Sequence, residues 1–290
     1  MNSPAYQTPQ PPRALTIAGS DSGAGAGIQA DLKTFAALEV YGLSALTAIT
    51  AQNTLGVRAA HTLAPELVEA QIDAVLEDIG ADAVKTGMLA TPEIIETVAR
   101  CIRRWKLPLV VDPVMVAKGG DRLLASTAVA TLREVLVPLA TVITPNLPEA
   151  EVLTGLRVES IAEMHAAAYA IAKLGARHVV VKGGHHAGEP VDVYFDGEQF
   201  IDLTAERVAT IHTHGTGCTF SAAIAAFLAR GFSVEGAIAS AKEYITSAIR
   251  HAPGIGHGHG PVEHFWQWKQ FLKITQVVPE NEKEEEYERE

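Results

Sequence analysis

Short apolar runs alternate with helical patterns along this chain, and this alternation limits the possible folds more than any other feature of the sequence. The runs have the nearly continuous hydrophobicity of strands that are buried on both faces. Parallel strands need long crossover connections, which are usually helices. The alternation therefore predicts an α/β fold with a central, mostly parallel sheet and helices on both faces. We expect its strands at residues 14–18, 43–50, 81–86, 109–112, 140–144 and 178–182.

Helices are expected where apolar residues recur at helical spacing between these runs. One start is marked by Thr91 as N-cap, Pro92 at the first helical position and Glu93 near the positive end of the helix dipole. Residues 191–203 instead predict a β-hairpin around Asp-Gly-Glu at 196–198. The expected helices cover residues 28–38, 65–79, 92 to at least 102, 126–136, 161–174, 219–230 and 234–249.

The composition is typical of a globular protein with a large core, since 48% of the 290 residues are hydrophobic and 20% are charged. We find no internal repeat and no clear boundary between domains. We therefore expect a disordered leader at residues 1–13, a single domain at 14–275 and an acidic, solvated tail at 276–290.

Charge and cysteine content exclude several classes of protein. A net charge of -11 argues against a nucleic-acid partner, although it leaves room for a locally positive pocket. Cys101 and Cys218 are far apart and do not make a disulfide framework. No apolar run approaches the length of a bilayer span, so a membrane partner is not expected. Together with the two isolated cysteines, this predicts a cytoplasmic location.

Polar residues follow several of the predicted strands at the point where each strand ends. Gln52, Asp112, Asn146 and Lys182 are in this position, and so is the glycine-rich loop at 19–27. Because ligands of open α/β sheets bind at the carboxyl ends of the strands, we expect these residues to meet at one edge. The loop has the spacing G-x-G-x-G and not that of a dinucleotide fingerprint, so it indicates only a backbone that must approach something closely.

A second glycine turn, Gly215-Thr216-Gly217, leads directly into a helical pattern with Cys218 near its start. Glycine amides and the positive end of a helix form an anion-binding turn, and a thiol placed there is expected to ionise more readily than a free one. The alternative is an ordinary capped loop with an inert cysteine.

These residue types together are suited to phosphoryl transfer. Oxygen ligands such as Asp112 and Glu149 suit Mg²⁺, and Lys182 with the anion-binding turn would balance phosphate charge. Each residue also has a structural interpretation. Glu149 is a plausible first-turn helix residue, and Lys182 a surface charge.

Motifs in the order of the chain resemble those of hydroxymethylpyrimidine/phosphomethylpyrimidine kinases from about Ala14 to about Trp266. They are Gly19-Ser20-Asp21-Ser22-Gly23, Gly27-Ile28-Gln29-Ala30-Asp31, Thr50-Ala51-Gln52-Asn53-Thr54, Lys85-Thr86-Gly87-Met88-Leu89, Asp112-Pro113-Val114-Met115, Thr144-Pro145-Asn146-Leu147-Pro148-Glu149, Lys182-Gly183-Gly184, His214-Gly215-Thr216-Gly217-Cys218-Thr219 and Gly256-His257-Gly258-His259-Gly260-Pro261.

The resemblance implies a ribokinase-like fold and a homodimer. It implies ATP-dependent phosphorylation of 4-amino-5-hydroxymethyl-2-methylpyrimidine, and then of its monophosphate, for thiamine biosynthesis. It also implies roles for the matching residues. The pyrimidine would be bound by Asp31, Gln52 and Met88, the nucleotide would be bound by Asn146, Lys182 and Gly183, and Mg²⁺ would be held by Asp112 and Glu149. The anion hole would be formed by Gly215, Thr216 and Gly217, and Cys218 would act on the acceptor hydroxyl. The chain departs from the family pattern at Ala24, where glycine is usual, and at His212.

Three alternatives accompany this interpretation. A pyridoxal/pyridoxamine kinase of the same superfamily would carry similar motifs. A non-catalytic pyrimidine-binding module should have lost some of the motifs, which are intact here. A zinc site at His257, His259 and His264 is less favoured than a structural role, because zinc usually needs Cys or carboxylate ligands as well.

Overall fold

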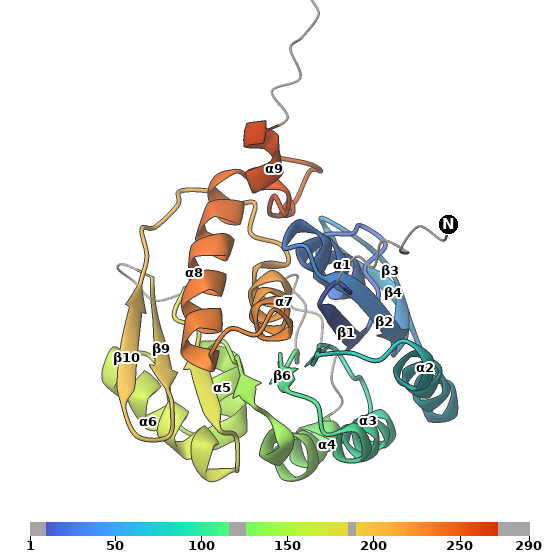
Figure 1. Ribbon diagram of the computed structural model, residues 1–290. Helices are drawn as coiled ribbons and strands as arrows, with labels where there is room; N and C mark the ends of the chain where they lie inside the picture. The colour runs from blue at the N-terminus through green and yellow to red at the C-terminus, as the bar shows by residue number, and fades with distance from the viewer. Residues whose placement is uncertain (1–9, 116–125, 185–189, 272–290) are drawn as a thin grey trace, which may run out of the picture.

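The computed structural model of the protein describes residues 10–115, 126–184 and 190–271 (Figure 1). Within these ranges the strands form one eight-stranded sheet in the order β10-β9-β8-β7-β6-β5-β1-β2. All neighbouring pairs from β2 to β8 are parallel, and β9 is antiparallel to both β8 and β10. This confirms the mostly parallel sheet and the terminal hairpin. The strands are β1 (Arg13–Ala18), β2 (Tyr41–Leu46), β5 (Ala83–Thr86), β6 (Leu109–Val111), β7 (Val142–Ile143), β8 (His178–Val181), β9 (Val191–Phe195) and β10 (Phe200–Thr204).

Helices cover both faces of this sheet and enclose two separate apolar clusters. Successive strand residues point to opposite faces, so Leu109 and Val111 of β6 pack into one cluster and Val110 packs into the other. The first cluster lies under α2 (Pro65–Asp78), α3 (Pro92–Trp105), α4 (Ser126–Thr131), the π-helical turn η1 (Leu132–Leu136), the 3-10 turn η2 (Val137–Leu139), α5 (Leu147–Thr154) and α6 (Ile161–Lys173). The second lies under α1 (Gly27–Ala37), α7 (Thr216–Ala229), α8 (Val234–Arg250) and the start of α9 (Trp266–Phe271).

All seven predicted helices are present, the one at 126–136 as α4 followed by the π-helical turn η1, and local capping explains where several begin. The hydroxyl of Thr91 accepts a hydrogen bond from the amide of Ile94, as expected for the N-cap of α3. Asn146 and Ser160 begin α5 and α6 through reciprocal capping boxes. Helix α5 had no counterpart among the predicted helices. Helix α7 begins at Thr216, three residues before the predicted start at 219.

The prediction of one strand at residues 43–50 is wrong. The chain leaves the sheet after β2, and β3 (Ala48–Asn53) pairs with β4 (Gly56–Thr62) in a separate two-stranded hairpin. The break falls at Thr47, whose amide donates to the carbonyl of Ala18 and whose hydroxyl donates to that of Met88 at 2.6 Å. The apolar run hides this break because both strands contain buried residues.

The predicted leader at 1–13 and tail at 276–290 lie largely or wholly outside the described residues, since β1 begins at Arg13 and the description ends at residue 271. Within the described ranges, no helix is long and apolar enough to span a bilayer.

Candidate active site

The polar residues that follow β6, β7 and β8 meet at the carboxyl edge of the sheet, as predicted. Lys182 Nζ donates to Asp112 Oδ1 at 3.2 Å, and Asn146 forms a parallel bridge with Lys182. The start of α7 approaches the same place, because a Cβ on Gly217 would lie 3.2 Å from Lys182 Nζ and 4.0 Å from each carboxylate oxygen of Asp112. A cation, a carboxylate and a helix N-terminus therefore share one small region.

Gly215 fixes the geometry of the anion-binding turn. It is the N-cap of α7 and has φ 78°, in the left-handed region that favours glycine. A Cβ there would lie 1.7 Å from the carbonyl oxygen of Gly25, so no other residue fits. Thr216, Gly217 and Cys218 follow as the first turn of the helix, where backbone amides have no acceptor within the helix. The amide of Thr216 donates to the carbonyl of Thr213 at 3.3 Å, and the amides of Gly217 and Cys218 can bind an anion such as a phosphoryl group.

Lys182 remains a cation in this region. Burial alone would lower its pKa, but the carboxylates of Asp112 and Glu149 raise it overall. A lysine in this position can balance the charge of bound phosphates. It is not the free surface charge that the alternative interpretation required, because its side chain is mostly buried against Asp112.

Asp112 and Glu149 have the chemistry to hold Mg²⁺. Asp112 is buried, and no described residue offers a hydrogen bond to its Oδ2 atom. Glu149 is also buried, and burial together with the nearby Asp112 raises its pKa to about 7, against the attraction of Lys182. Two such carboxylates suit an ion that takes few protein ligands and leans on waters and phosphates. The described residues contain no group of three His, Cys, Asp or Glu that would hold a metal on its own.

Glu149 also has the structural role that the sequence left open. One of its oxygens accepts the amide of Asn146 at 2.8 Å, and Asn146 Oδ1 accepts the amide of Glu149 at 2.9 Å. This capping box fixes the start of α5 and occupies the side-chain oxygen of Asn146, a residue predicted to contact the nucleotide. Glu149 is also close enough to Asp112 for that carboxylate to contribute to its raised pKa.

The predicted acceptor-binding residues lie in two different settings. Gln52 is on β3, with its amide nitrogen 3.5 Å from Nε2 of His214. The side chain of Met88 packs against Gly19, since a Cβ on Gly19 would lie 2.4 Å from the methyl group of Met88. Asp31, by contrast, is fully buried in α1, and both of its carboxylate oxygens are bound by Lys85, with Thr16 bonded to one of them. Asp31 is thus bonded to Lys85 and Thr16, and its contact with the pyrimidine stays a prediction.

Sequence reasoning overlooked Lys85. Its ammonium group is fully buried and lies 3.0 and 2.9 Å from the two oxygens of Asp31. Although burial alone would lower its pKa, the neighbouring carboxylate of Asp31, helped by Cys218 and Asp112, raises it. The available signal was a lysine inside an otherwise uncharged strand, β5, because such a residue needs a buried partner.

The expectation that the thiol of Cys218 ionises readily is wrong for this structure. Burial raises its pKa to about 12, and Asp112 and Asp31 add to this shift. The ammonium of Lys85 and the amide of Gly27 act in the opposite direction but do not overcome it. The position at a helix start therefore does not lower the pKa of this thiol, because the thiol is buried and the same edge gathers carboxylates.

Gly183 is held by a pair of residues that the sequence did not point to. Its amide donates to Asp192 Oδ1 at 2.9 Å, and Lys242 Nζ donates to the other oxygen of Asp192 at 2.6 Å. A Cβ on Gly183 would lie 2.0 Å from the carbonyl oxygen of Val191. Only glycine fits here, and the predicted nucleotide contact is fixed from β9 and α8.

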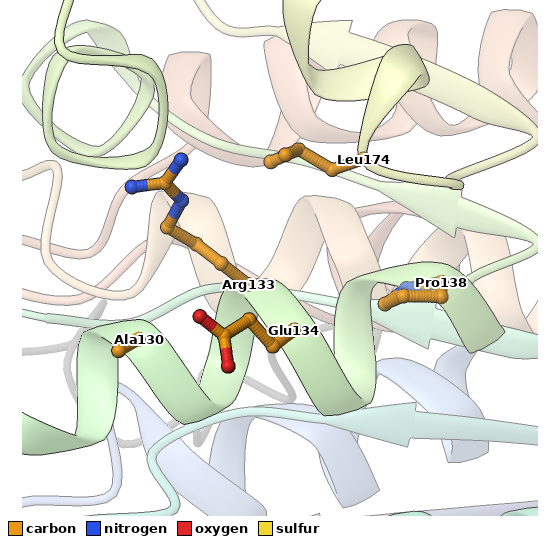
Figure 2. Close-up of a pocket in the computed structure, with 5 residues that line it drawn as sticks. All are labelled: Ala130, Arg133, Glu134, Pro138 and Leu174. Atoms are coloured by element: carbon orange, nitrogen blue, oxygen red, sulfur yellow. The ribbon is translucent and has the colours of Figure 1, made fainter.

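A separate hollow of about 360 Å³ lies between η1, η2 and the end of α6 (Figure 2). Pro138 and Leu174 of its lining precede the starts of β7 and β8, so it lies at the opposite edge of the sheet. None of the predicted site residues line it, and we assign it no part in the chemistry.

The family model described as phosphomethylpyrimidine kinase matches residues 21–263. The chain belongs to this family. A member from Bacillus subtilis, a hydroxymethylpyrimidine/phosphomethylpyrimidine kinase, is 52% identical over 256 residues, which are 87% of this chain and 94% of the relative. The thiamine biosynthesis bifunctional protein ThiED of Geobacter sulfurreducens is 54% identical over 252 residues, which are 86% of this chain and 51% of that longer protein.

Among solved structures, an ADP complex of Bacillus subtilis pyridoxal kinase aligns with a TM-score of 0.84 and 45% identity, covering 89% of this chain and 99% of that one. The resemblance found in the sequence is thus confirmed, together with the ribokinase-like fold and the class of enzyme, a kinase.

Proposed function

We propose that this member of the family phosphorylates 4-amino-5-hydroxymethyl-2-methylpyrimidine with ATP, and then phosphorylates the resulting monophosphate to the diphosphate for thiamine biosynthesis. The similarity to the Bacillus subtilis kinase over nearly the full length of both chains is the observation that carries this proposal. The similarity to ThiED supports the pathway. The cluster of Asp112, Lys182 and Gly217 supports the reaction type, since it places charge-balancing groups around one point.

Each group has a distinct task in this proposal. Asp112 and Glu149 would hold Mg²⁺, which would supply positive charge to balance that of the phosphates. Lys182 and the amides of Gly217 and Cys218 would stabilise the charge on the transferred phosphoryl group. Gln52 offers both a donor and an acceptor to the edge of an aminopyrimidine, and Met88 packs against the ring.

Only the thiolate form of Cys218 could take the proton of the acceptor hydroxyl during the first transfer. Because burial raises the pKa of this thiol to about 12, it would first have to release its own proton to solvent. The ammonium of Lys85 favours the thiolate, so formation of the base would depend on Lys85 and on the bound substrates.

The direct test is incubation with Mg²⁺-ATP and the hydroxymethylpyrimidine, with the mono- and diphosphate followed by mass spectrometry. Both products should form in sequence and should require the divalent cation. Absence of any phosphorylated pyrimidine would contradict the proposal.

A pyridoxal kinase is the second candidate, favoured by the 45% identity to the solved pyridoxal kinase. Pyridoxal also carries a hydroxymethyl group on a flat ring, so the two acceptors should be compared side by side. A higher kcat/KM for pyridoxal than for the hydroxymethylpyrimidine would make pyridoxal phosphorylation the main activity.

A homodimer and a cytoplasmic location also belong to this proposal. Both stem from the sequence: the first from the family resemblance, the second from the two isolated cysteines. Sedimentation of the purified protein would test the first.

A further inference from the structure

The imidazole of His214 lies where three parts of the site meet. Its Nε2 atom is 2.8 Å from Asp21 Oδ2, in the glycine-rich loop that follows β1. The same nitrogen is 3.5 Å from the amide nitrogen of Gln52 on β3. The next residue along the chain is Gly215, the N-cap of α7 and the first residue of the anion-binding turn. One ring therefore contacts both the acceptor side and the segment that begins the anion-binding turn.

Asp21 organises the glycine-rich loop around this contact. Its Oδ1 accepts the amide of Gly23 at 2.8 Å, and its Oδ2 accepts the amides of Gly25 at 3.1 Å and Ala26 at 2.8 Å. Burial by itself raises the pKa of Asp21, but the hydrogen bonds from His214 and the backbone lower it overall. Because a charged carboxylate only accepts hydrogen bonds, the Nε2 atom of His214 carries the proton in this contact. Its 3.5 Å approach to the amide nitrogen of Gln52 is therefore a packing contact between two donors and not a hydrogen bond.

The two glycine segments interlock at the same place. A Cβ on Gly25 would lie 2.4 Å from Cδ2 of His214, and a Cβ on Gly215 would lie 1.7 Å from the carbonyl oxygen of Gly25. The amide of His214 also donates to the carbonyl of Gly260 at 3.0 Å. Neither segment can shift without moving the other, and the bond between Asp21 and His214 is the side-chain link between them.

We propose that Asp21 and His214 are positioning residues that set the anion-binding turn at the correct distance from the acceptor held by Gln52. The proposal rests on the proposed function, because it assigns Gln52 to the acceptor. The two residues act on the acceptor side of the site only. On the nucleotide side, Gly183 is fixed by Asp192, and no described contact joins that pair to His214. Loss of the link should disturb transfer while leaving nucleotide binding intact.

The main variant is His214→Ala, which removes the ring and leaves Asp21 without its side-chain partner. A misplacement of about 1 Å costs on the order of 100-fold in rate, so kcat for the hydroxymethylpyrimidine should fall by about that factor. The dissociation constant for ADP should change by less than about threefold, a split that a general loss of structure would not give.

His214→Gln is the conservative variant, because a glutamine amide can still donate to Asp21. It should recover most of the lost kcat. Asp21→Asn keeps one acceptor oxygen and loses the charge, so an intermediate loss is expected. If the residues act as a pair, Asp21→Asn combined with His214→Ala should be no worse than His214→Ala alone within about threefold.

A surface pair of the same composition serves as the control. His165 and Asp202 lie 2.7 Å apart, exposed, between α6 and β10. His165→Ala should leave kcat and ADP binding unchanged. Amide hydrogen exchange adds a readout that needs no substrate: in His214→Ala, peptides covering residues 19–27 and 213–219 should both exchange faster, while a peptide covering 177–184 should not.

Three results would overturn the inference: an unchanged kcat in His214→Ala, equal losses of ADP affinity and kcat, or no recovery in His214→Gln. If His214→Ala does not fold, the same comparison between His214→Gln and Asp21→Asn decides. Failure of the proposed function is a different outcome, since the wild-type protein would then form no pyrimidine phosphate while its hydrogen exchange could still show the link.

Discussion

The buried ion pair of Lys85 and Asp31 offers the sharpest test of how this site is held together. Both side chains are fully buried, and Lys85 bonds to both oxygens of Asp31. Lys85→Met would leave a buried carboxylate with only the hydroxyl of Thr16 as a side-chain partner. Removing one partner of a buried pair costs about 3–5 kcal/mol, because the other charge stays uncompensated. We expect a loss of this size in the free energy of unfolding.

A second substitution distinguishes an unpaired charge from simple loss of packing. In Lys85→Met combined with Asp31→Asn, the buried group is neutral and can still accept the hydrogen bond from Thr16. The remaining cost is that of an incompletely bonded amide, about 1–3 kcal/mol. The double variant should therefore be more stable than Lys85→Met alone by about 2 kcal/mol, even though it carries one more substitution.

The assay is urea unfolding followed by circular dichroism at pH 7, with the exposed pair Arg157 and Glu159 as the control. Arg157→Met should cost no more than about 1 kcal/mol, as is usual for a surface ion pair. A loss of less than about 1 kcal/mol in the free energy of unfolding of Lys85→Met, or a double variant less stable than Lys85→Met, would refute the destabilising effect of the unpaired carboxylate.

Three further predictions follow from single residues. Ala24 has φ 59°, a conformation that costs a non-glycine residue about 1–2 kcal/mol. Glycine would relieve this cost, but its greater freedom in the unfolded chain would cancel part of the gain. Ala24→Gly should therefore raise the free energy of unfolding by about 0.5–1 kcal/mol, and a decrease would contradict this. Cys218→Ala should slow the first phosphorylation more than the second, because the hydroxymethyl group must lose a proton and the monophosphate is already ionised; equal losses in the two rates would remove this role. Burial lowers the pKa of His264 to about 4, so the folded protein resists its protonation and loses stability as the pH falls from about 6.5 to 4. Glutamine does not titrate, so over this pH range the wild type should lose about 3 kcal/mol more of its free energy of unfolding in urea than His264→Gln. If the free energies of unfolding of the two proteins changed in parallel with pH, His264 would be accessible to protons in the folded protein.

The sheet and its polar edge were predictable because both follow from local patterns. Apolar runs that end in Asp112 or Lys182 specify a buried strand and the edge of the sheet at which its polar residues follow. The contacts that hold the site were not predictable in this way. Asp31 and Lys85 are 54 residues apart, and Asp21 and His214 are 193 apart. No periodicity links such pairs, so only the folded arrangement reveals which charge belongs to which partner.

The two glycine motifs contact each other, and this contact also could not be predicted from either motif alone. Read separately, the first indicated only a backbone that approaches something closely, and the second an anion-binding turn. In the structure each is the close neighbour of the other: Gly215 needs the space beside the carbonyl of Gly25, and Gly25 needs the space beside the ring of His214. A side chain at either position would push the glycine-rich loop away from the start of α7. Their glycines therefore serve contact between two loops as much as contact with phosphate. Although Gly25 is far from the anion-binding turn in sequence, Gly25→Ala should therefore disturb that turn as strongly as a substitution within the turn.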